Sequence, residues 1–233
     1  MDKLIVALDY SDLKEAEKIV KKISPLVKIF KVGKELFTTA GPDAVRMVHA
    51  HKCRVFLDLK FHDIPNTVAS ACEAAAKMGV FMVNVHASGG KNMLFAAVQA
   101  VHKFAEDSKK PAPKLLGVTV LTSLQDRDLK EVGVAKKVQD QVKLLAVLSK
   151  GCGLDGVVAS GQEIPLIRKA AGKDLLIVTP GVRPTWAAHG DQKRIITPKE
   201  AVDSGADFIV VGRPITQHPQ PLVAAEKILK EIE

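Results

Sequence analysis

The chain has 233 residues, which suits one large domain or two small ones, and 47% of them are hydrophobic, enough for a sizeable core. A formal net charge of +8 would suit an anionic partner, but the lysines are spread along the chain and aromatic residues make up only 4%. Nucleic-acid binding needs a clustered basic face and often stacking aromatics, so the composition argues against it. A small phosphorylated substrate would fit a basic chain as well.

The cysteines and the N-terminal segment indicate a cytoplasmic, soluble protein. Cys53, Cys72 and Cys152 are odd in number and widely spaced, and no CxxC or Cys/His cluster occurs. We therefore expect neither a zinc site nor a disulfide framework. Only five apolar residues, Leu4 to Leu8, precede Asp9, which is too short a run for a signal peptide or a membrane span.

Short apolar runs alternate with amphipathic segments from end to end. The runs are rich in Val, Ile and Leu, as strands of a parallel sheet buried on both faces are. They predict strands at Leu4–Asp9, Val27–Val32, Arg54–Leu59, Phe81–His86, Leu115–Leu121, Gly156–Ala159, Leu175–Val178 and Phe208–Val211. Helical periodicity predicts helices at Ser11–Ile23 (with Ser11 as the N-cap), Pro42–Ala50, Pro65–Met78, Asn92–Ala105, Lys136–Leu148, Glu163–Ala170, Pro198–Ser204 and Leu222–Ile232.

Eight strand–helix units without a linker or a change of composition predict a single domain over residues 1–233, an α/β fold of the (β/α)8 TIM-barrel type. An open doubly wound sheet is the alternative. Against it, no G-x-G-x-x-G follows the first strand, where Ala7-Leu8-Asp9 stands instead.

Polar residues stand where the predicted strands end, which is the face on which barrel enzymes carry their sites. They come from strands one to five and from strand eight: Asp9, Lys31, Asp58, Lys60, His86, Thr122, Gly212 and Arg213. Within Asp58-x-Lys60-x-x-Asp63, strand alternation places Asp58 and Lys60 on the same face. A structural salt bridge would explain one such pair. Five ionisable groups from three consecutive strands are hard to explain by packing.

Val211-Gly212-Arg213-Pro214-Ile215 predicts a phosphate site. A glycine allows close approach of the backbone, Pro214 can open a short helix, and Arg213 supplies a cation. The alternative is a tight turn with a solvated arginine. The connection Pro180–Thr197 is long for a barrel loop and carries Arg183 and Gln192, which could grip a phosphate if the loop is a lid rather than a flexible polar loop.

Several motifs in order along the chain resemble the orotidine 5′-monophosphate decarboxylase family. They are Ala7-Leu8-Asp9, Lys31-Val32-Gly33, Asp58-Leu-Lys60-Phe-His-Asp63-Ile-Pro-Asn-Thr67, Val120-Leu121-Thr122-Ser123, Thr179-Pro180-Gly181-Val182-Arg183-Pro184, Asp191-Gln192-Lys193-Arg194 and Val210-Val211-Gly212-Arg213-Pro214. The resemblance runs essentially end to end, without a departure at a catalytic position.

The resemblance implies conversion of orotidine monophosphate to uridine monophosphate and CO2, the last step of de novo pyrimidine biosynthesis, without metal or cofactor. Lys60 would be the cation and general acid, beside Asp58. Other residues would bind the ribose hydroxyls (Asp9, Lys31, Asp63), the pyrimidine (Thr122) and the phosphate (Arg183, Gln192, Gly212, Arg213). Asp63 and Thr67 would come from the partner subunit of a homodimer.

Two other functions stay open on the residues alone. A Mg²⁺-dependent sugar-phosphate decarboxylase of the same barrel group shares Asp-x-Lys-x-x-Asp, but Lys31 is a poor neighbour for a metal. A non-catalytic barrel that binds phosphate or nucleic acid would explain the basic charge but not the alternation of Lys and Asp. His62 and His86 adjoin the charged residues, and a hydrogen-bonded structural role is the more usual one for such histidines.

Overall fold

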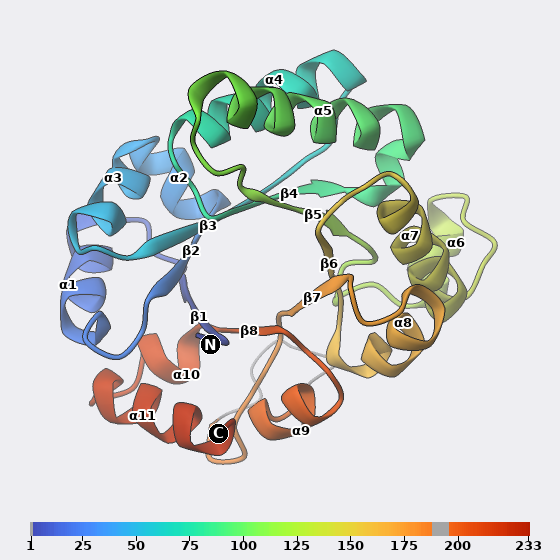
Figure 1. Ribbon diagram of the computed structural model, residues 1–233. Helices are drawn as coiled ribbons and strands as arrows, with labels where there is room; N and C mark the ends of the chain where they lie inside the picture. Colours follow the sequence, from blue (N-terminus) through green and yellow to red (C-terminus); the bar gives the residue numbers. More distant parts are fainter. Residues whose placement is uncertain (1, 188–195) are drawn as a thin grey trace.

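The computed structural model describes residues 2–187 and 196–233, and in these ranges eight parallel strands close into a barrel in chain order (Figure 1). The strands are β1 (Leu4–Leu8), β2 (Ile29–Gly33), β3 (Arg54–Phe61), β4 (Met82–His86), β5 (Lys114–Val118), β6 (Gly156–Val158), β7 (Leu176–Thr179) and β8 (Phe208–Val211). The first strand pairs with the last, with Leu4 opposite Ile209, so the sheet has no free edge. The predicted TIM barrel is confirmed.

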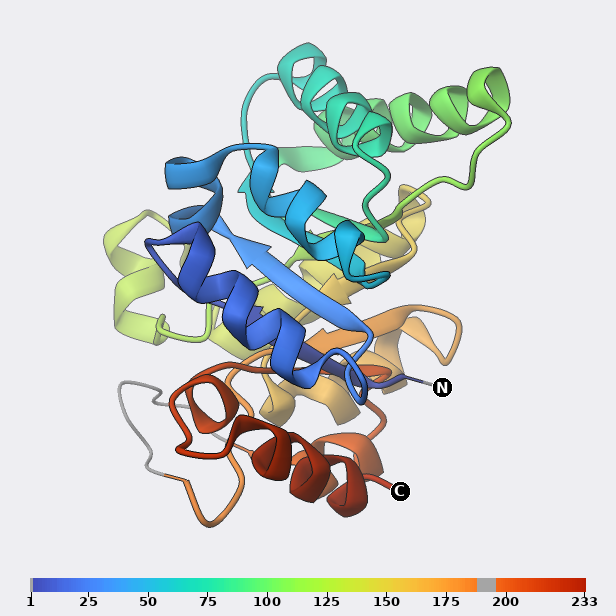
Figure 2. The same ribbon diagram turned by 90° about the vertical axis from the view of Figure 1, so that its left-hand side faces the viewer.

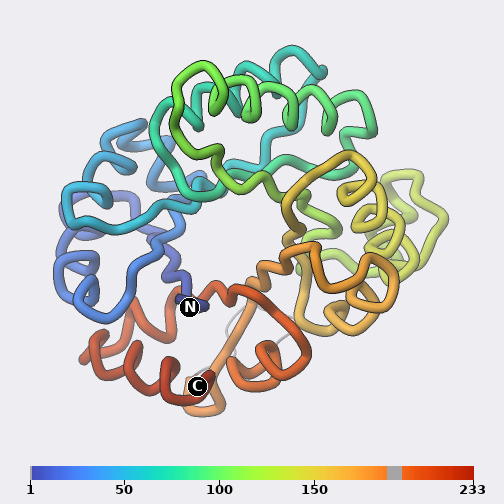
Figure 3. The backbone as a smooth tube through the Cα atoms, viewed as in Figure 1, coloured from blue at the N-terminus to red at the C-terminus, as the bar shows by residue number. Residues whose placement is uncertain are grey.

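Helices surround the strands, and the backbone trace makes one closed circuit of strand–helix units (Figures 1 and 3). The α-helices are α1 (Leu13–Ile23), α2 (Lys34–Ala40), α3 (Asp43–Ala50), α4 (Pro65–Lys77), α5 (Gly90–Ser108), α6 (Asp126–Glu131), α7 (Val138–Gly151), α8 (Ile164–Ala171), α9 (Pro198–Asp203), α10 (Arg213–Thr216) and α11 (Pro221–Glu231). Two 3-10 turns, η1 (Ala87–Gly89) and η2 (Gly161–Glu163), precede α5 and α8. No helix in the described ranges is long and apolar enough to cross a membrane.

The strand predictions are right in place and differ only at the ends. The largest difference is in β5, which ends at Val118 rather than at Leu121. The predicted N-cap Ser11 is wrong. Asp12 caps α1 instead, because its carboxylate accepts hydrogen bonds from the backbone N–H groups of Lys14 and Glu15.

Alternation of side chains divides the apolar residues into two layers. One layer lies between strands and helices. The other fills the barrel and consists of Ile5, Ala7, Ile29, Phe56, Met82, Leu116, Val118, Val158, Val178, Phe208 and Val210. The barrel is therefore packed by side chains and is not a pore.

The two ends of the barrel differ. Both chain termini lie at one end, and α6 lies at the other, where the strands finish (Figure 2). At the end with the termini, Arg168 donates to the carbonyl oxygens of Leu175 and Gly205 and to the carboxylate of Asp207. Polar groups at the amino ends of β7 and β8 thus tie loops together.

Candidate active site

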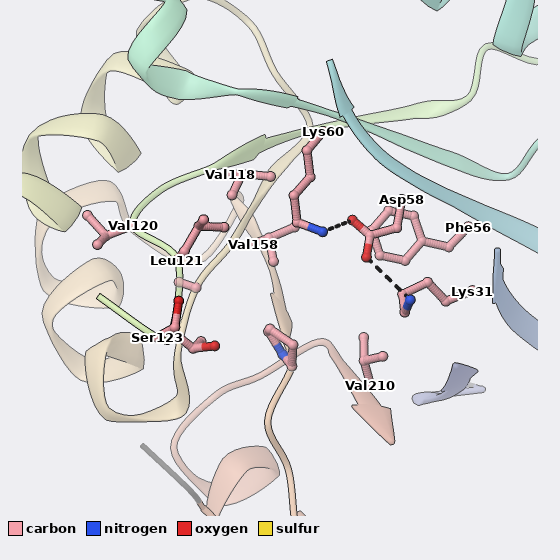
Figure 4. A pocket seen from close by; sticks show the side chains of 13 residues that line it. Lys31, Phe56, Asp58, Lys60, Val118, Val120, Leu121, Ser123, Val158 and Val210 are labelled. Carbon is pink, nitrogen blue, oxygen red and sulfur yellow. Dashed lines mark hydrogen bonds and ion pairs between the residues drawn. The ribbon is translucent and has the colours of Figure 1, made fainter. Parts of the chain in front are cut away.

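Charged side chains of alternating sign form a chain of ion pairs at the carboxyl ends of β1, β2 and β3. The Nζ atom of Lys31 lies 3.0 Å from Asp9 Oδ1 and 3.5 Å from Asp58 Oδ2. The other oxygen of that second carboxylate, Asp58 Oδ1, lies 2.6 Å from Lys60 Nζ. Figure 4 shows Asp58 between the two lysines. The structure therefore brings these four residues together, as their positions at strand ends predicted.

The ion pairs of Asp58 with Lys31 and Lys60 are largely shielded from water. The side chains of Lys31 and Asp58 are each 12% exposed and that of Lys60 is 23% exposed. Burial by itself would raise the pKa of Asp58, but Lys31, Lys60 and two hydrogen bonds outweigh it, and the pKa is lowered. Burial would likewise lower the pKa of Lys31, but the carboxylates of Asp58 and Asp9 raise it above its usual value. Both groups are therefore charged at neutral pH.

Inward-facing positions explain why these residues meet. In β2 the apolar Ile29 is followed two residues later by Lys31, and in β3 Phe56 is followed by Asp58. The same face that fills the barrel lower down therefore carries charge at its mouth.

The backbone of β3 departs from regular strand geometry at Lys60. This residue has φ of 55°, in the left-handed region, and the pairing of β3 with β4 shifts register between Leu57 and Phe61. Simple alternation therefore does not describe the strand here, although Lys60 and Asp58 do make contact.

Asn84 on β4 is a site residue that we did not predict. It is fully buried, its Nδ2 donates to Asp58 Oδ1 over 2.7 Å, and its Oδ1 accepts from the backbone N–H of Lys60 over 2.8 Å. The signal was present in the sequence: Met82 faces the barrel interior, and Asn84 is two residues further along the same strand.

A cavity of about 280 Å³ opens beside the ion pairs (Figure 4). One wall carries Lys31, Asp58 and Lys60, and the opposite wall is largely apolar. The other lining residues are Phe56, Val118, Val120, Leu121, Thr122, Ser123, Val158, Ala159, Pro180 and Val210. Such a pocket can enclose a flat ring between charged groups and aliphatic side chains. Thr122 lines it, next to Ser123.

A second cavity of about 190 Å³ adjoins the first, because Lys31, Pro180 and Val210 line both. It also carries Asp9, Arg183, Gly212 and Arg213. Gly212 precedes α10, whose first turn contains Pro214, as predicted.

The Arg183 side chain suits an anion in this second cavity. The residue is only 8% exposed, and its Nε has no hydrogen-bond partner among the described residues. Burial and the nearby charge of Arg213 lower the pKa of Arg183. Two cations that face one cavity repel each other, and a bound dianion would relieve that repulsion.

Gly33 makes room for Lys31. A Cβ atom on this glycine would lie 2.8 Å from Lys31 Nζ and 3.4 Å from Asp9 Oδ1. The backbone at Gly33 has φ of −95°, which any residue can adopt. A side chain at this position would therefore push aside the Lys31 ammonium group and disturb the ion pairs, although the chain conformation itself would accept it.

The remaining predicted site residues do not join this cluster. Asp63 and Thr67 are exposed, and the Asp63 carboxylate accepts a hydrogen bond from the backbone N–H of Ile64. Within one chain, Asp63 therefore does not extend the series of Lys31, Asp58 and Lys60. Gln192 lies outside the described residues.

The described residues contain no group of three or more His, Cys, Asp or Glu side chains that could hold a metal ion. The most buried carboxylate at the mouth, that of Asp58, is occupied by Lys31 and Lys60. The ammonium groups of Lys31 and Lys60, 3.5 Å and 2.6 Å from the Asp58 oxygens, would repel a divalent cation bound to this carboxylate.

Comparisons with known proteins agree with this geometry. The model of the family described as orotidine 5′-phosphate decarboxylase / HUMPS matches residues 2–228. The chain belongs to this family.

Members of the family with curated names resemble the chain over nearly its full length. The orotidine 5′-phosphate decarboxylase of Moorella thermoacetica is 55% identical over 100% of the chain and 92% of its own length. The protein of the same name from Syntrophotalea carbinolica is 53% identical, over 99% of the chain and 94% of its own length.

Solved structures share the fold. Orotidine 5′-phosphate decarboxylase from Lactobacillus acidophilus is 38% identical, has a TM-score of 0.86, and is matched over 100% of both chains. An uncharacterized conserved protein from Geobacillus kaustophilus is 35% identical with a TM-score of 0.87, matched over 99% of this chain and 100% of that one.

His86 adjoins the cluster but is neutral at neutral pH. Its ring centroid lies 5.4 Å from that of His62. Burial, together with the positive charges of His62, Lys34 and Lys60, lowers the pKa of His86 to about 4, although Asp58 opposes this shift. An imidazole with so low a pKa is poorly suited to hold a proton for donation at pH 7.

We predict that His86 makes the folded chain less stable in mild acid. The unfolded chain protonates this imidazole as the pH falls through about 6.5, whereas the folded chain does so only near pH 4. Between these values the unfolded state binds more protons, so the free energy of unfolding falls as the pH is lowered. The free energy of unfolding, measured with urea from pH 7 to pH 4, should depend less on pH in His86→Gln than in the wild type.

The control for this measurement is His102→Gln, which changes an exposed histidine on α5. It should keep the wild-type dependence on pH. If His86→Gln also kept that dependence, His86 would not be the group that titrates.

Proposed function

We propose that this chain decarboxylates orotidine 5′-monophosphate to uridine 5′-monophosphate and CO2, in pyrimidine biosynthesis and without metal or cofactor. The observation that carries the proposal is the series of ion pairs that joins Asp9, Lys31, Asp58 and Lys60. The last three line one cavity, and two arginines line the adjoining cavity. Relatives that bear this enzyme's name at more than 50% identity support it.

Lys60 would supply the proton that replaces CO2. The bond between C6 of the pyrimidine and the carboxylate carbon breaks, and its electron pair stays on C6. A proton moves from the ammonium group of Lys60 to C6, and the resulting amine takes a new proton from solvent. The cation also stabilises the charge while it develops, because it is held in place beforehand by Asp58, 2.6 Å away.

Asp58 would lie near the carboxylate of the substrate. Two negative charges at close range repel each other, and that repulsion disappears as neutral CO2 departs. Lys31 holds the second oxygen of Asp58, so the carboxylate cannot turn away from the substrate without losing an ion pair. The same lysine links Asp58 to Asp9, which we propose binds a ribose hydroxyl.

The rest of the substrate would span the two cavities. Thr122 would contact the pyrimidine in the larger one. Arg183, Gly212 and Arg213 would bind the phosphate in the smaller one, and we propose the same role for Gln192. A planar guanidinium can make two hydrogen bonds to one phosphate, which suits two arginines in a small cavity.

We propose that the functional unit is a homodimer in which Asp63 and Thr67 reach the site of the partner. Both residues are exposed, and so is Ile64 between them, at 67%. A partner chain on this segment would bury the isoleucine. It would also deliver the carboxylate of Asp63, which finds no place in the cluster of its own chain.

We further propose that the enzyme acts in the cytoplasm. All three cysteines are free and buried, as in proteins of reducing compartments. Burial raises the pKa of Cys72 to about 12, so this thiol is inert.

A Mg²⁺-dependent sugar-phosphate decarboxylase is the less favoured function. A metal-bound enediolate needs carboxylate ligands, and Asp58 is already neutralised by Lys31 and Lys60. The test is loss of orotidine monophosphate absorbance in the presence of EDTA. Turnover at the same rate with and without EDTA supports the proposed reaction, and loss of turnover in EDTA contradicts it.

We predict that Lys60→Ala abolishes turnover without unfolding the protein, because it removes both the cation and the proton donor. The expected loss in kcat is at least ~10⁴-fold, about 5.5 kcal/mol in transition-state terms. Lys109→Ala is a matched control, because Lys109 has a similar φ of 57° but caps the far end of α5. If Lys60→Ala kept a tenth of the wild-type rate, the role given to Lys60 would be wrong.

We predict that mixing inactive Lys60→Ala and Asp63→Ala proteins restores activity. A heterodimer would contain one site free of both changes, and statistical exchange would recover about a quarter of the wild-type rate. Mixing Lys60→Ala with Asp58→Ala is the control, because both residues belong to the same site and each site would still lack one. No recovery in the first mixture, with subunit exchange demonstrated, would mean that each site is built within one chain.

We predict that Arg213→Ala weakens substrates that carry the 5′-phosphate and barely affects orotidine, which lacks it. Loss of a charge-assisted hydrogen bond to phosphate is worth about 1.5–3 kcal/mol, roughly 10- to 150-fold in kcat/KM. Added guanidinium should restore part of the loss.

The control for this comparison is Arg127→Ala, which removes an arginine on α6 that lines neither cavity. It should leave both substrates unaffected. Equal losses for both substrates in Arg213→Ala would place Arg213 with the fold or the chemistry and not with the phosphate.

A further inference from the structure

Asn84 lies opposite an irregular segment of β3. Phe61 pairs with Val85, although Leu57 pairs with Val83, so β3 has two more residues here than β4. Lys60 lies in this segment with φ of 55°, a conformation that costs a non-glycine residue of the order of 1 kcal/mol or more. Its backbone N–H donates to the Oδ1 atom of the Asn84 side chain.

The two ends of the Asn84 amide have different tasks. A backbone N–H can only donate, so the atom that faces Lys60 N must be the amide oxygen. This leaves the NH2 group for Asp58 Oδ1, which can only accept while the carboxylate is ionised. The fully buried Asn84 therefore connects the main chain of Lys60 to the carboxylate of Asp58. The ammonium group of Lys60 contacts that same carboxylate.

We propose that Asn84 is a positioning residue that sets the place of the Lys60 ammonium group relative to Asp58; this rests on the proposed role of Lys60. The amide holds both ends of the Lys60–Asp58 pair: the backbone at one end and the shared oxygen at the other. Asn84 does not line either cavity, so it acts on the reaction through these two residues.

The substitutions Asn84→Ala and Asn84→Asp separate positioning from packing. Alanine removes both hydrogen bonds. Aspartate keeps the shape and can still accept from Lys60 N–H, but its second oxygen then meets Asp58 Oδ1, at the 2.7 Å now spanned by a hydrogen bond. Two carboxyl groups so close hold one proton between them until the pH is high enough to remove it. When this proton is present, the aspartate at position 84 can donate a hydrogen bond to Asp58, as the amide of Asn84 does.

We expect Asn84→Ala to lower kcat by about 10- to 100-fold and to change KM less than about threefold, because the phosphate contacts are untouched. The ratio of this variant's kcat to that of the wild type should not depend on pH. For Asn84→Asp the same ratio should rise as the pH is lowered, since the pair then regains its proton. Ser149→Ala, which removes another fully buried hydrogen bond, on α7, is the control for loss of packing and should keep the wild-type kcat.

Each outcome decides the inference. The positioning role of Asn84 would be overturned if folded Asn84→Ala had the wild-type kcat. It would also be overturned if the ratio of the Asn84→Asp kcat to the wild-type kcat did not change with pH. If Asn84→Ala does not fold, the pH dependence of Asn84→Asp decides alone. The wild type and Lys60→Ala distinguish the levels: a wild type that does not decarboxylate orotidine monophosphate contradicts the proposed function, and an active Lys60→Ala contradicts the role of Lys60 on which the inference rests. An inactive Lys60→Ala beside a fully active Asn84→Ala contradicts only the positioning role.

Discussion

The site depends on the buried carboxylate of Asp58. Two ammonium groups, those of Lys31 and Lys60, lie within 3.5 Å of its oxygens in a place that water hardly reaches. Without this negative charge the two ammonium groups would repel each other, and burial would lower the pKa of Lys31. With it, and with Asp9, the pKa of Lys31 is raised, so that its positive charge is in place before any substrate arrives. Positive charge that is in place beforehand needs no rearrangement during the reaction, which is how electrostatic catalysis is most effective.

The closed barrel provides the rigidity that such a cluster needs. Apolar side chains fill the interior of the barrel, and the charged residues stand directly above them on the same inward faces. Because the strands are fixed by their neighbours on both sides, the backbone positions from which the charged side chains extend are held in place. Polar groups that stabilise the fold lie at the end of the barrel opposite the site. There Arg168 and Asp207 connect the loops at the amino ends of β7 and β8.

The sequence alone was enough to predict the barrel, because eight apolar runs of strand length alternate with helical patterns. It also placed Asp58 and Lys60 at the mouth, since both follow a buried strand. It could not predict the left-handed backbone of Lys60, because that conformation is held by Asn84, a residue distant in the chain. The sequence also could not distinguish Asp12 from Ser11 as the cap of α1, because both residue types can cap a helix. Only the structure shows that the backbone N–H groups of the first turn donate to Asp12.

Gly33 and Lys31 share one space at the mouth of the barrel. A side chain there would displace the Nζ atom of Lys31, which two carboxylates hold, while the backbone itself would accept any residue. Selection at position 33 therefore acts on the lysine. A residue larger than glycine at position 33 would push the ammonium group of Lys31 away from the carboxylates that hold it. A shorter residue at position 31 would leave room for a side chain at position 33, so the space that one position can use depends on the residue at the other.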